Sequence, residues 1–208
     1  SFETLFSSIP GLKVMMPVFP NEAYQLMNRA IKDNNPTIFL EQRWCHYGVG
    51  NYDTKIIDDG DSFTKLSSGS MLTLVSMGYA SIEALQVVNF LRSYKINIEL
   101  FNLKIMRPLK INKIINSVKK TKKIITIDNG PVTLGLGSEI ISQLVEKSIL
   151  FKESPTRLGL PDHPVPSSRS FIDEVYVTPT KIIQSVLKTL KIDKKTSKDI
   201  IKKYISNL

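Results

Sequence analysis

Short apolar runs alternate with longer stretches in which apolar residues recur every three or four positions along this chain. The short runs predict buried strands, and the 3.6-residue recurrence predicts amphipathic helices. The runs that predict strands lie at residues 12–16, 37–40, 62–66, 71–76, 97–103 and 124–128. The stretches that predict helices lie at residues 20–31, 81–94, 109–118, 138–151 and 180–190.

Strands that alternate with helices of ten or more residues indicate βαβ units. We therefore predict an α/β protein with three layers, in which helices cover both faces of a mainly parallel, five-stranded sheet. Residues 48–68 are rich in Gly, Asp and Ser and lack sustained periodicity, as is typical of a linker. This linker separates the end of a first α/β domain, residues 1–47, from a second domain over residues 69–191.

A Lys-rich amphipathic tail helix is predicted over residues 192–208. Its apolar residues from Ile200 to Leu208 have helical spacing, and Ser197 is the candidate N-cap. Two roles remain open for this helix. It either covers the core as a lid or offers a docking surface.

The charge balance is basic, with 28 Lys and Arg against 19 Asp and Glu and a formal net charge of +9. Such a surplus invites nucleic-acid binding, because cations that neutralise phosphates release counterions. The surplus is mostly lysine and gathers at residues 119–123 and 188–203, without the interleaved aromatic residues or arginines that bind bases. This distribution is typical of a solvated lysine face and argues against a nucleic-acid partner.

The sequence has features typical of a cytoplasmic protein. No stretch approaches the roughly 18 uncharged apolar residues that a membrane-spanning helix requires, and no basic segment followed by an apolar run opens the chain. The single cysteine, Cys45, excludes a disulfide framework and a multi-cysteine metal site. We therefore expect a cytoplasmic protein with no membrane partner.

Two series of motifs resemble a known family. The segments IPGLKVMMP (9–17), NEA (21–23), AIKDNNP (30–36) and IFLE (38–41) resemble the later half of the pyrimidine-binding domain in the beta subunit of 2-oxo acid dehydrogenases. The segments MRPL (106–109), SVKKT (117–121), GLGSEI (135–140) and DHPVP (162–166) follow in the order and spacing of that subunit's transketolase-like C-terminal domain. The resemblance therefore covers nearly the whole chain.

The resemblance implies a thiamine diphosphate-dependent enzyme of the pyruvate and branched-chain type. In that family the cofactor sits between an alpha and a beta subunit, and its phosphates are bound by the alpha subunit. The enzyme decarboxylates a 2-oxo acid and passes the acyl group to a lipoyl domain. The implied partners are a second copy in a homodimer built on residues 69–190, the alpha subunit, and the binding domain of the dihydrolipoyl acyltransferase.

The departures from the family pattern set the expected role. The family's catalytic glutamate and a histidine would both precede Ser1, so we expect a C-terminal part of a longer subunit that assembles and docks and does not catalyse alone. Asn102-Leu103-Lys104 stands where the family favours Asp-Leu-Arg, and Asn129 where it favours an acidic residue. The 2-oxo acid therefore stays open. The alternatives are a split transketolase or deoxyxylulose-phosphate synthase-like component and a catalytically silent assembly module.

A candidate cation site follows the first predicted helix. A helix C-terminus leaves its last four carbonyls unpaired and carries about half a negative charge. Ala30, Ile31, Asp33 and Asn35 could therefore place oxygens around a monovalent cation, although Asp, Asn and Pro also form an ordinary helix stop. In the family that this chain resembles, the pattern Ala-Ile-x-Asp-x-Asn holds a structural potassium ion, so the resemblance implies a metal site at these four residues.

Three other segments with reactive or phosphate-binding residue types are interpreted as structural. Cys45 and His46 are adjacent, and neighbours on an extended segment would point to opposite faces. The glycine-rich turn at residues 130–137 lacks the full phosphate-binding fingerprint and is predicted to allow close packing of a helix on a strand. His163 lies in a proline-rich loop without a second histidine or a carboxylate cluster nearby, which favours a surface or junction position.

Overall fold

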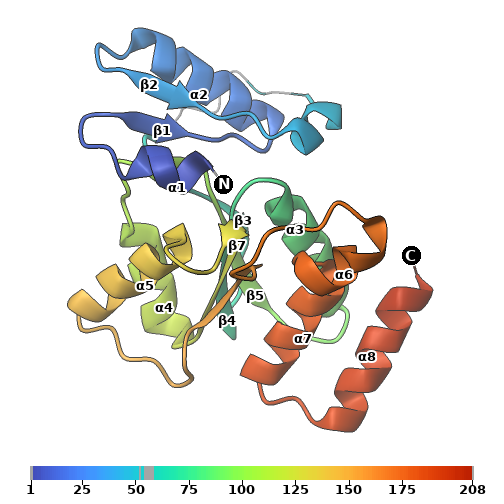
Figure 1. Ribbon diagram of the computed structural model, residues 1–208. Coiled ribbons are helices and arrows are strands. Elements are labelled where there is room, and N and C mark those ends of the chain that lie inside the picture. Colours follow the sequence, from blue (N-terminus) through green and yellow to red (C-terminus); the bar gives the residue numbers. More distant parts are fainter. Residues whose placement is uncertain (1, 52, 54–58, 208) are drawn as a thin grey trace.

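The computed structural model describes residues 2–51, 53 and 59–207. Figure 1 shows a small sheet with two helices at one end of the molecule and a larger sheet between two helical layers below it. Among the described residues, no helix has the length and apolar character needed to cross a membrane.

The small sheet contains three strands in the order β2-β1-β6. The elements of this part are α1 (Phe2–Ser7), β1 (Lys13–Met15), α2 (Pro20–Lys32), β2 (Thr37–Phe39) and the 3₁₀ helix η1 (Arg43–Tyr47). Strand β1 pairs parallel with β2, as expected of the predicted strand, helix and strand, and antiparallel with β6 (Ile105–Arg107). Helix α1 had not been predicted, because six residues are too few to show a helical period.

The large sheet has five strands in the order β3-β5-β4-β7-β8, and all neighbours pair parallel except β3 with β5. Its strands are β3 (Phe63–Ser67), β4 (Leu72–Ser76), β5 (Ile98–Leu103), β7 (Ile124–Pro131) and β8 (Thr156–Leu160). The predicted mainly parallel, five-stranded sheet is therefore confirmed. The sequence did not locate β8, whose TRLGL stretch is half-exposed and interrupted by Arg157 and Gly159.

Two hydrophobic layers cover the large sheet, as the three-layer prediction required. The helices are α3 (Tyr79–Arg92), α4 (Asn112–Thr121), α5 (Leu136–Glu146), α6 (Ile172–Val175), α7 (Pro179–Thr189) and α8 (Lys194–Ser206), with the 3₁₀ helix η2 at Arg169–Phe171. Leu72 and Leu74 of β4 face the core shared with α3, α7 and α8, and Val75 faces the core shared with α4 and α5. Successive strand residues thus serve opposite layers.

The predicted helices are shifted by up to five residues at their ends, and two of these differences have a clear local cause. Ser197 is not the N-cap of α8, because the side chain of Asp193 caps this helix by accepting a hydrogen bond from the Thr196 N–H at 2.9 Å. Helix α5 ends at Glu146 and not at residue 151, because Ser148 turns the backbone to a φ of 54° that ends the helix. Both errors concern local turn chemistry and leave the layers unchanged.

Candidate functional site

The connections of the large sheet place a crevice at the carboxyl end of β4. From β4 the chain crosses through α3 to β5 on one side, and it later returns through α4 to β7 on the other side. In open α/β sheets, ligands bind outside the carboxyl ends of the strands where the connections diverge in this way. Ser76 ends β4, and Asp128 lies toward the carboxyl end of β7.

A cavity of about 370 Å³ lies at this position. We call it the switch-point cavity; the lining residues that matter here are Gln42, Trp44, Tyr79, Glu83, Asp128 and Tyr176. The Gln42 side-chain carbonyl accepts a hydrogen bond from the backbone N–H of Tyr79. The rings of Trp44 and Tyr79 are 5.6 Å apart between centroids, so the segment after β2 forms one wall and the large domain forms the rest.

Two carboxyl groups of the switch-point cavity hold protons more tightly than usual. Desolvation raises the pKa of Glu83 to about 7, and this side chain has no hydrogen-bond or ion-pair partner among the described residues. Desolvation also raises the pKa of Asp128 to about 6, while the backbone N–H of Gly137 donates to its oxygens at 3.2 and 3.3 Å and opposes the shift. Near neutral pH, the cavity can therefore exchange protons or accept a cationic group.

A buried hydrogen-bond chain joins the small sheet to the large one beside this cavity. Asn102 donates its side-chain N–H groups to Glu22, and the Asn102 carbonyl accepts from the Ser81 hydroxyl at 2.7 Å. The Ser81 hydroxyl in turn lies 2.8 Å from that of Ser76. Glu22 also accepts the N–H of Val18 at 3.0 Å, which ties the start of α2 into the same chain. The relative position of the two sheets is fixed by these polar contacts.

The four residues of the candidate cation site lie on one turn at the end of α2. The backbone N–H of Asp33 donates to the Ala30 carbonyl at 3.4 Å. One oxygen of the Asp33 carboxylate accepts the backbone and side-chain N–H groups of Asn35, both at 2.9 Å, and the other binds the Lys13 ammonium. Lys13 is the main cause that lowers the pKa of Asp33 to about 2. The Asp33 carboxylate is thus already paired with a cation, which leaves neutral carbonyl oxygens of the turn for an ion.

The Cys45–His46 pair is not on an extended segment as expected, because both residues lie in the 3₁₀ helix η1. Cys45 is partly buried, and desolvation, with a smaller contribution from the charge of Glu22, raises the pKa of its thiol. A thiol that stays protonated is a poor nucleophile. Trp44 beside it packs on Tyr79, so this segment contributes a cavity wall and not a reactive thiolate.

The glycine turn and His163 occupy the structural positions that the sequence favoured. A Cβ atom on Gly137 would lie 2.7 Å from the Asp128 carboxylate and would also collide with the Thr126 side chain, so glycine is required where α5 meets β7. His163 is exposed, and its Nδ1 lies 3.0 Å from the carbonyl of the adjacent Pro164. Neither feature forms part of the switch-point cavity.

Sequence reasoning missed the residues that line the cavity. Glu83 looked like an ordinary polar position on a helix, and Gln42 and Tyr176 belong to segments with no period. One signal was available, since Asp128 and Ser76 are the polar residues that follow apolar runs at the carboxyl ends of parallel strands. Applying the rule for such strand ends would have marked this crevice.

Fold and cavity together define an α/β module of the transketolase type. Residues 62–182 match the family described as "Transketolase, C-terminal domain", and residues 1–44 match "Transketolase, pyrimidine binding domain". The first match covers more than half of the chain, which therefore belongs to the transketolase C-terminal domain family.

Beta subunits of 2-oxo acid dehydrogenases are among the similar proteins. The chain is 29% identical to the mitochondrial pyruvate dehydrogenase E1 component subunit beta of Saccharomyces cerevisiae, over 92% of this chain and 54% of that protein. It is 33% identical to the corresponding subunit of Rickettsia bellii, over 76% of this chain and 49% of that protein. The chain thus spans about half the length of these curated relatives.

Solved structures show the same fold at lower identity. A split-gene transketolase, described as an inactive beta4 tetramer, superposes with a TM-score of 0.75 at 20% identity, over 92% of this chain and 61% of that one. A transketolase from Pichia stipitis in complex with sedoheptulose 7-phosphate gives a TM-score of 0.63 at 15% identity, over 92% of this chain and 27% of that one. These structures support the transketolase-like architecture.

Proposed function

We propose that this chain acts as the C-terminal part of the beta subunit of a thiamine diphosphate-dependent 2-oxo acid dehydrogenase. The observation that supports this proposal best is the similarity to pyruvate dehydrogenase beta subunits across both parts of the chain. The buried chain from Glu22 to Ser76 gives these parts a fixed geometry. The proposed role is to support and orient the cofactor-binding half of the subunit.

The chain's own residues do not fit the metal-diphosphate end of the cofactor. Among the described residues, no group of three or more His, Cys, Asp or Glu side chains could hold a metal ion. When bound to the complete enzyme, thiamine diphosphate would supply the carbanion chemistry of 2-oxo acid decarboxylation. We derive no step of that chemistry from this chain and assign it no catalysis of its own.

The proposed partners are a second copy of the chain, the alpha subunit and the binding domain of a dihydrolipoyl acyltransferase. Exposed apolar side chains support the first two. Phe2 and Leu5 of α1 are 68% and 57% exposed, and Leu134 before α5 and Leu150 after it are 82% and 76% exposed. Phe2 and Leu5 lie three positions apart on α1, and contiguous exposed apolar surface marks interaction sites. The proposal retains the cytoplasm as the compartment, which suits the free thiol of Cys45.

Co-expression tests the proposal. The complete beta subunit to which this chain is proposed to belong is expressed with a 2-oxo acid dehydrogenase alpha subunit, and the purified complex is assayed for decarboxylation of pyruvate and of branched 2-oxo acids. Ketol transfer from a ketose phosphate is measured in parallel. We expect a complex and decarboxylation. Ketol transfer without decarboxylation would establish the split transketolase, and assembly without either reaction would establish the silent module.

Light scattering tests the homodimer separately. We expect a dimer at micromolar concentration, both for the chain and for a variant that ends at residue 191. Ile200 and Tyr204 of α8 pack into the core, so the shortened chain is first checked for cooperative unfolding. A monomer in both cases would contradict the homodimer, and a monomer after truncation of a folded chain would move the interface to α8.

We also propose a potassium ion at the end of α2, held by backbone carbonyls of Ala30, Ile31, Asp33 and Asn35. The turn that gathers these residues supports the assignment. Because Lys13 neutralises the Asp33 side chain, the ion would be bound through carbonyl dipoles and not through a carboxylate. A monovalent cation suits such a ligand set better than a divalent one.

A further inference from the structure

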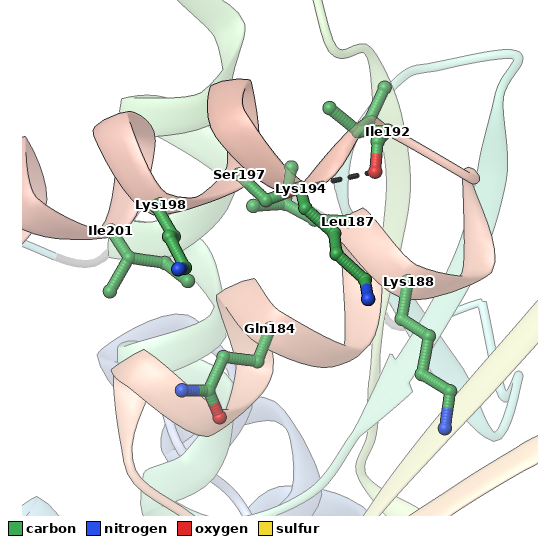
Figure 2. Close-up of a pocket in the computed structure, with 8 residues that line it drawn as sticks. All are labelled: Gln184, Leu187, Lys188, Ile192, Lys194, Ser197, Lys198 and Ile201. Atoms are coloured by element: carbon green, nitrogen blue, oxygen red, sulfur yellow. Dashed lines mark hydrogen bonds between the residues drawn. The ribbon is translucent and has the colours of Figure 1, made fainter.

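Helices α7 and α8 form a hairpin whose outer side is grooved. The groove has a volume of about 400 Å³ and is lined by eight residues of the two helices and the turn between them. Figure 2 shows these side chains, with Gln184 and Lys188 on α7 and Lys198 and Ile201 on α8. The Ser197 hydroxyl donates to the Ile192 carbonyl at 3.3 Å and ties the turn to α8. We call this surface the α7–α8 groove.

The walls of the groove are rigid because the opposite sides of both helices belong to the core. Ile183 and Val186 of α7 are fully buried, and Ile200 of α8 is 2% exposed. The ring of Tyr204 packs edge-on against Phe90 of α3, with 5.0 Å between centroids. A preformed groove loses less conformational entropy on binding than a mobile one. The α7–α8 groove is therefore a preformed surface for a ligand.

The chemistry of the groove is apolar at the floor and cationic at the rim. The partly buried Ile192 and Ile201 supply the accessible apolar surface above the buried Leu187, and Lys188, Lys194 and Lys198 supply the charge. None of these three lysines forms an ion pair with a carboxylate of the described residues. Asp193, beside Lys194, is engaged as the cap of α8. Asp199, beside Lys198, is exposed and forms no ion pair with the described residues. The rim charges are available to a partner.

The charge of the whole α7–α8 hairpin also favours an acidic partner. Residues 181–203 contain eight lysines and two aspartates, which accounts for six of the nine net positive charges of the chain. Such a field attracts an acidic partner and speeds its association. It also opposes pairing of the groove with the same groove of a second copy. The surface contains no arginine and no aromatic side chain among its lining residues, so it lacks the groups that stack on bases.

We propose that the α7–α8 groove binds an acidic amphipathic helix of a partner protein. Apolar side chains of that helix at i, i+3, i+4 and i+7 would lie on Ile192 and Ile201, as in other helix-in-groove complexes. Its flanking carboxylates would pair with Lys188, Lys194 and Lys198. The groove residues 184–201 lie beyond the matched segment 62–182, and this proposal does not depend on the proposed enzymatic function.

The test uses fluorescence anisotropy with a labelled 18-residue peptide that has leucines at helical spacing and glutamates on both sides. A scrambled peptide of the same composition and a single-stranded DNA of equal charge are the competing probes. We expect the helical peptide to bind at least tenfold more tightly than the scrambled one, and its affinity to fall as salt rises, because salt screens the lysines.

Charge-reversed variants locate the binding. K188E/K194E/K198E is expected to weaken peptide binding at least tenfold, whereas K119E/K147E/K152E, which changes the same charge at exposed lysines on other elements, is expected to change it less than twofold. Ile201→Ser removes apolar floor without changing charge and is expected to weaken binding severalfold. Circular dichroism verifies the fold of each variant.

Three outcomes would overturn the proposal. The scrambled peptide could bind as tightly as the helical one, or the two triple variants could lose affinity equally, and either result would mean nonspecific charge attraction. DNA could bind more tightly than the peptide and lose that binding in K188E/K194E/K198E, which would make the groove a polyanion surface.

Discussion

The side-chain amide of Asn102 donates hydrogen bonds to both carboxylate oxygens of Glu22, at 3.0 and 2.9 Å, across 80 positions of the chain. Glu22 is 3% exposed and Asn102 is fully buried. A carboxylate that is taken out of water needs such donors, because an uncompensated buried charge is costly. Asn102 stands where the family resemblance favours aspartate, and here the amide supplies the donor that a carboxylate lacks.

Asn102→Asp should destabilise the protein. The substitution would replace a donor with a second carboxylate against Glu22 and leave the Glu22 oxygens only the backbone N–H donors of Val18 and Phe19. We expect a loss of about 2 to 4 kcal/mol in the free energy of unfolding at pH 7, measured by urea denaturation. Asn89→Asp on the exposed face of α3 is the control, and an equal loss there would contradict the assigned pairing.

The stability of the protein should depend on pH through Glu83. Its folded pKa of about 7 lies above the ordinary value of 4.5, so the folded state binds the proton more tightly and stability is lost as pH rises from about 4.5 to about 7. Two other groups with raised pKa values, Tyr204 and Asp128, lie near Glu83. The charge of Glu83 adds to desolvation in raising the pKa of Tyr204, and Asp128 shifts in the same direction as Glu83.

Glu83→Gln removes this titration. We expect the variant to be more stable than the natural chain by about 1 to 2 kcal/mol at pH 8, after allowance for solvent screening, and nearly equal to it at pH 4. Thermal unfolding at both pH values provides the measurement. Glu146→Gln on the exposed end of α5 is the matched control. A pH-independent difference between Glu83→Gln and the natural chain would show that folding does not raise the pKa of Glu83.

Potassium should stabilise the turn after α2. Binding to the folded state by an ion that the unfolded chain does not bind raises the unfolding temperature. We expect an increase of about 2 to 4 °C in potassium chloride over tetramethylammonium chloride, and a smaller one in sodium chloride. Lys13→Met frees the Asp33 carboxylate and should increase the response to all small cations. Identical unfolding temperatures in the three salts would contradict the assignment of a potassium ion to this turn.

Gly137→Ala should be costly although alanine favours helices. Its Cβ would lie 2.7 Å from a carboxylate oxygen of Asp128 and would collide with Thr126. Overpacking of this kind costs about 1 to 3 kcal/mol. Gly48→Ala, whose Cβ would meet its nearest neighbour, the Cys45 carbonyl, at 3.3 Å, should cost less. Urea denaturation of the two variants compares them, and equal losses would show that α5 can move away from β7.

Periodicity predicted the sheet and its layers because the apolar residues of β4, β5 and β7 are buried and leave clear runs in the sequence. Strand β8 was not predicted because an edge strand buries few side chains and therefore leaves no clear apolar run. Its five residues include Arg157 and Gly159. The switch-point cavity was not predicted for a different reason. Gln42, Glu83 and Tyr176 come from three distant segments, and only the sheet order brings them together.

Strand β6 follows β5 in the chain but completes the sheet that begins with β1 and β2. The two sheets are therefore interleaved in sequence, and a boundary drawn through residues 48–68 does not separate two independent building blocks. A chimaera that exchanges residues 1–47 for those of a relative would replace β1, the strand that pairs with β6, and the Glu22 half of a buried pair. Exchange of subunit halves between relatives should succeed when β1, β6, Glu22 and Asn102 come from the same parent.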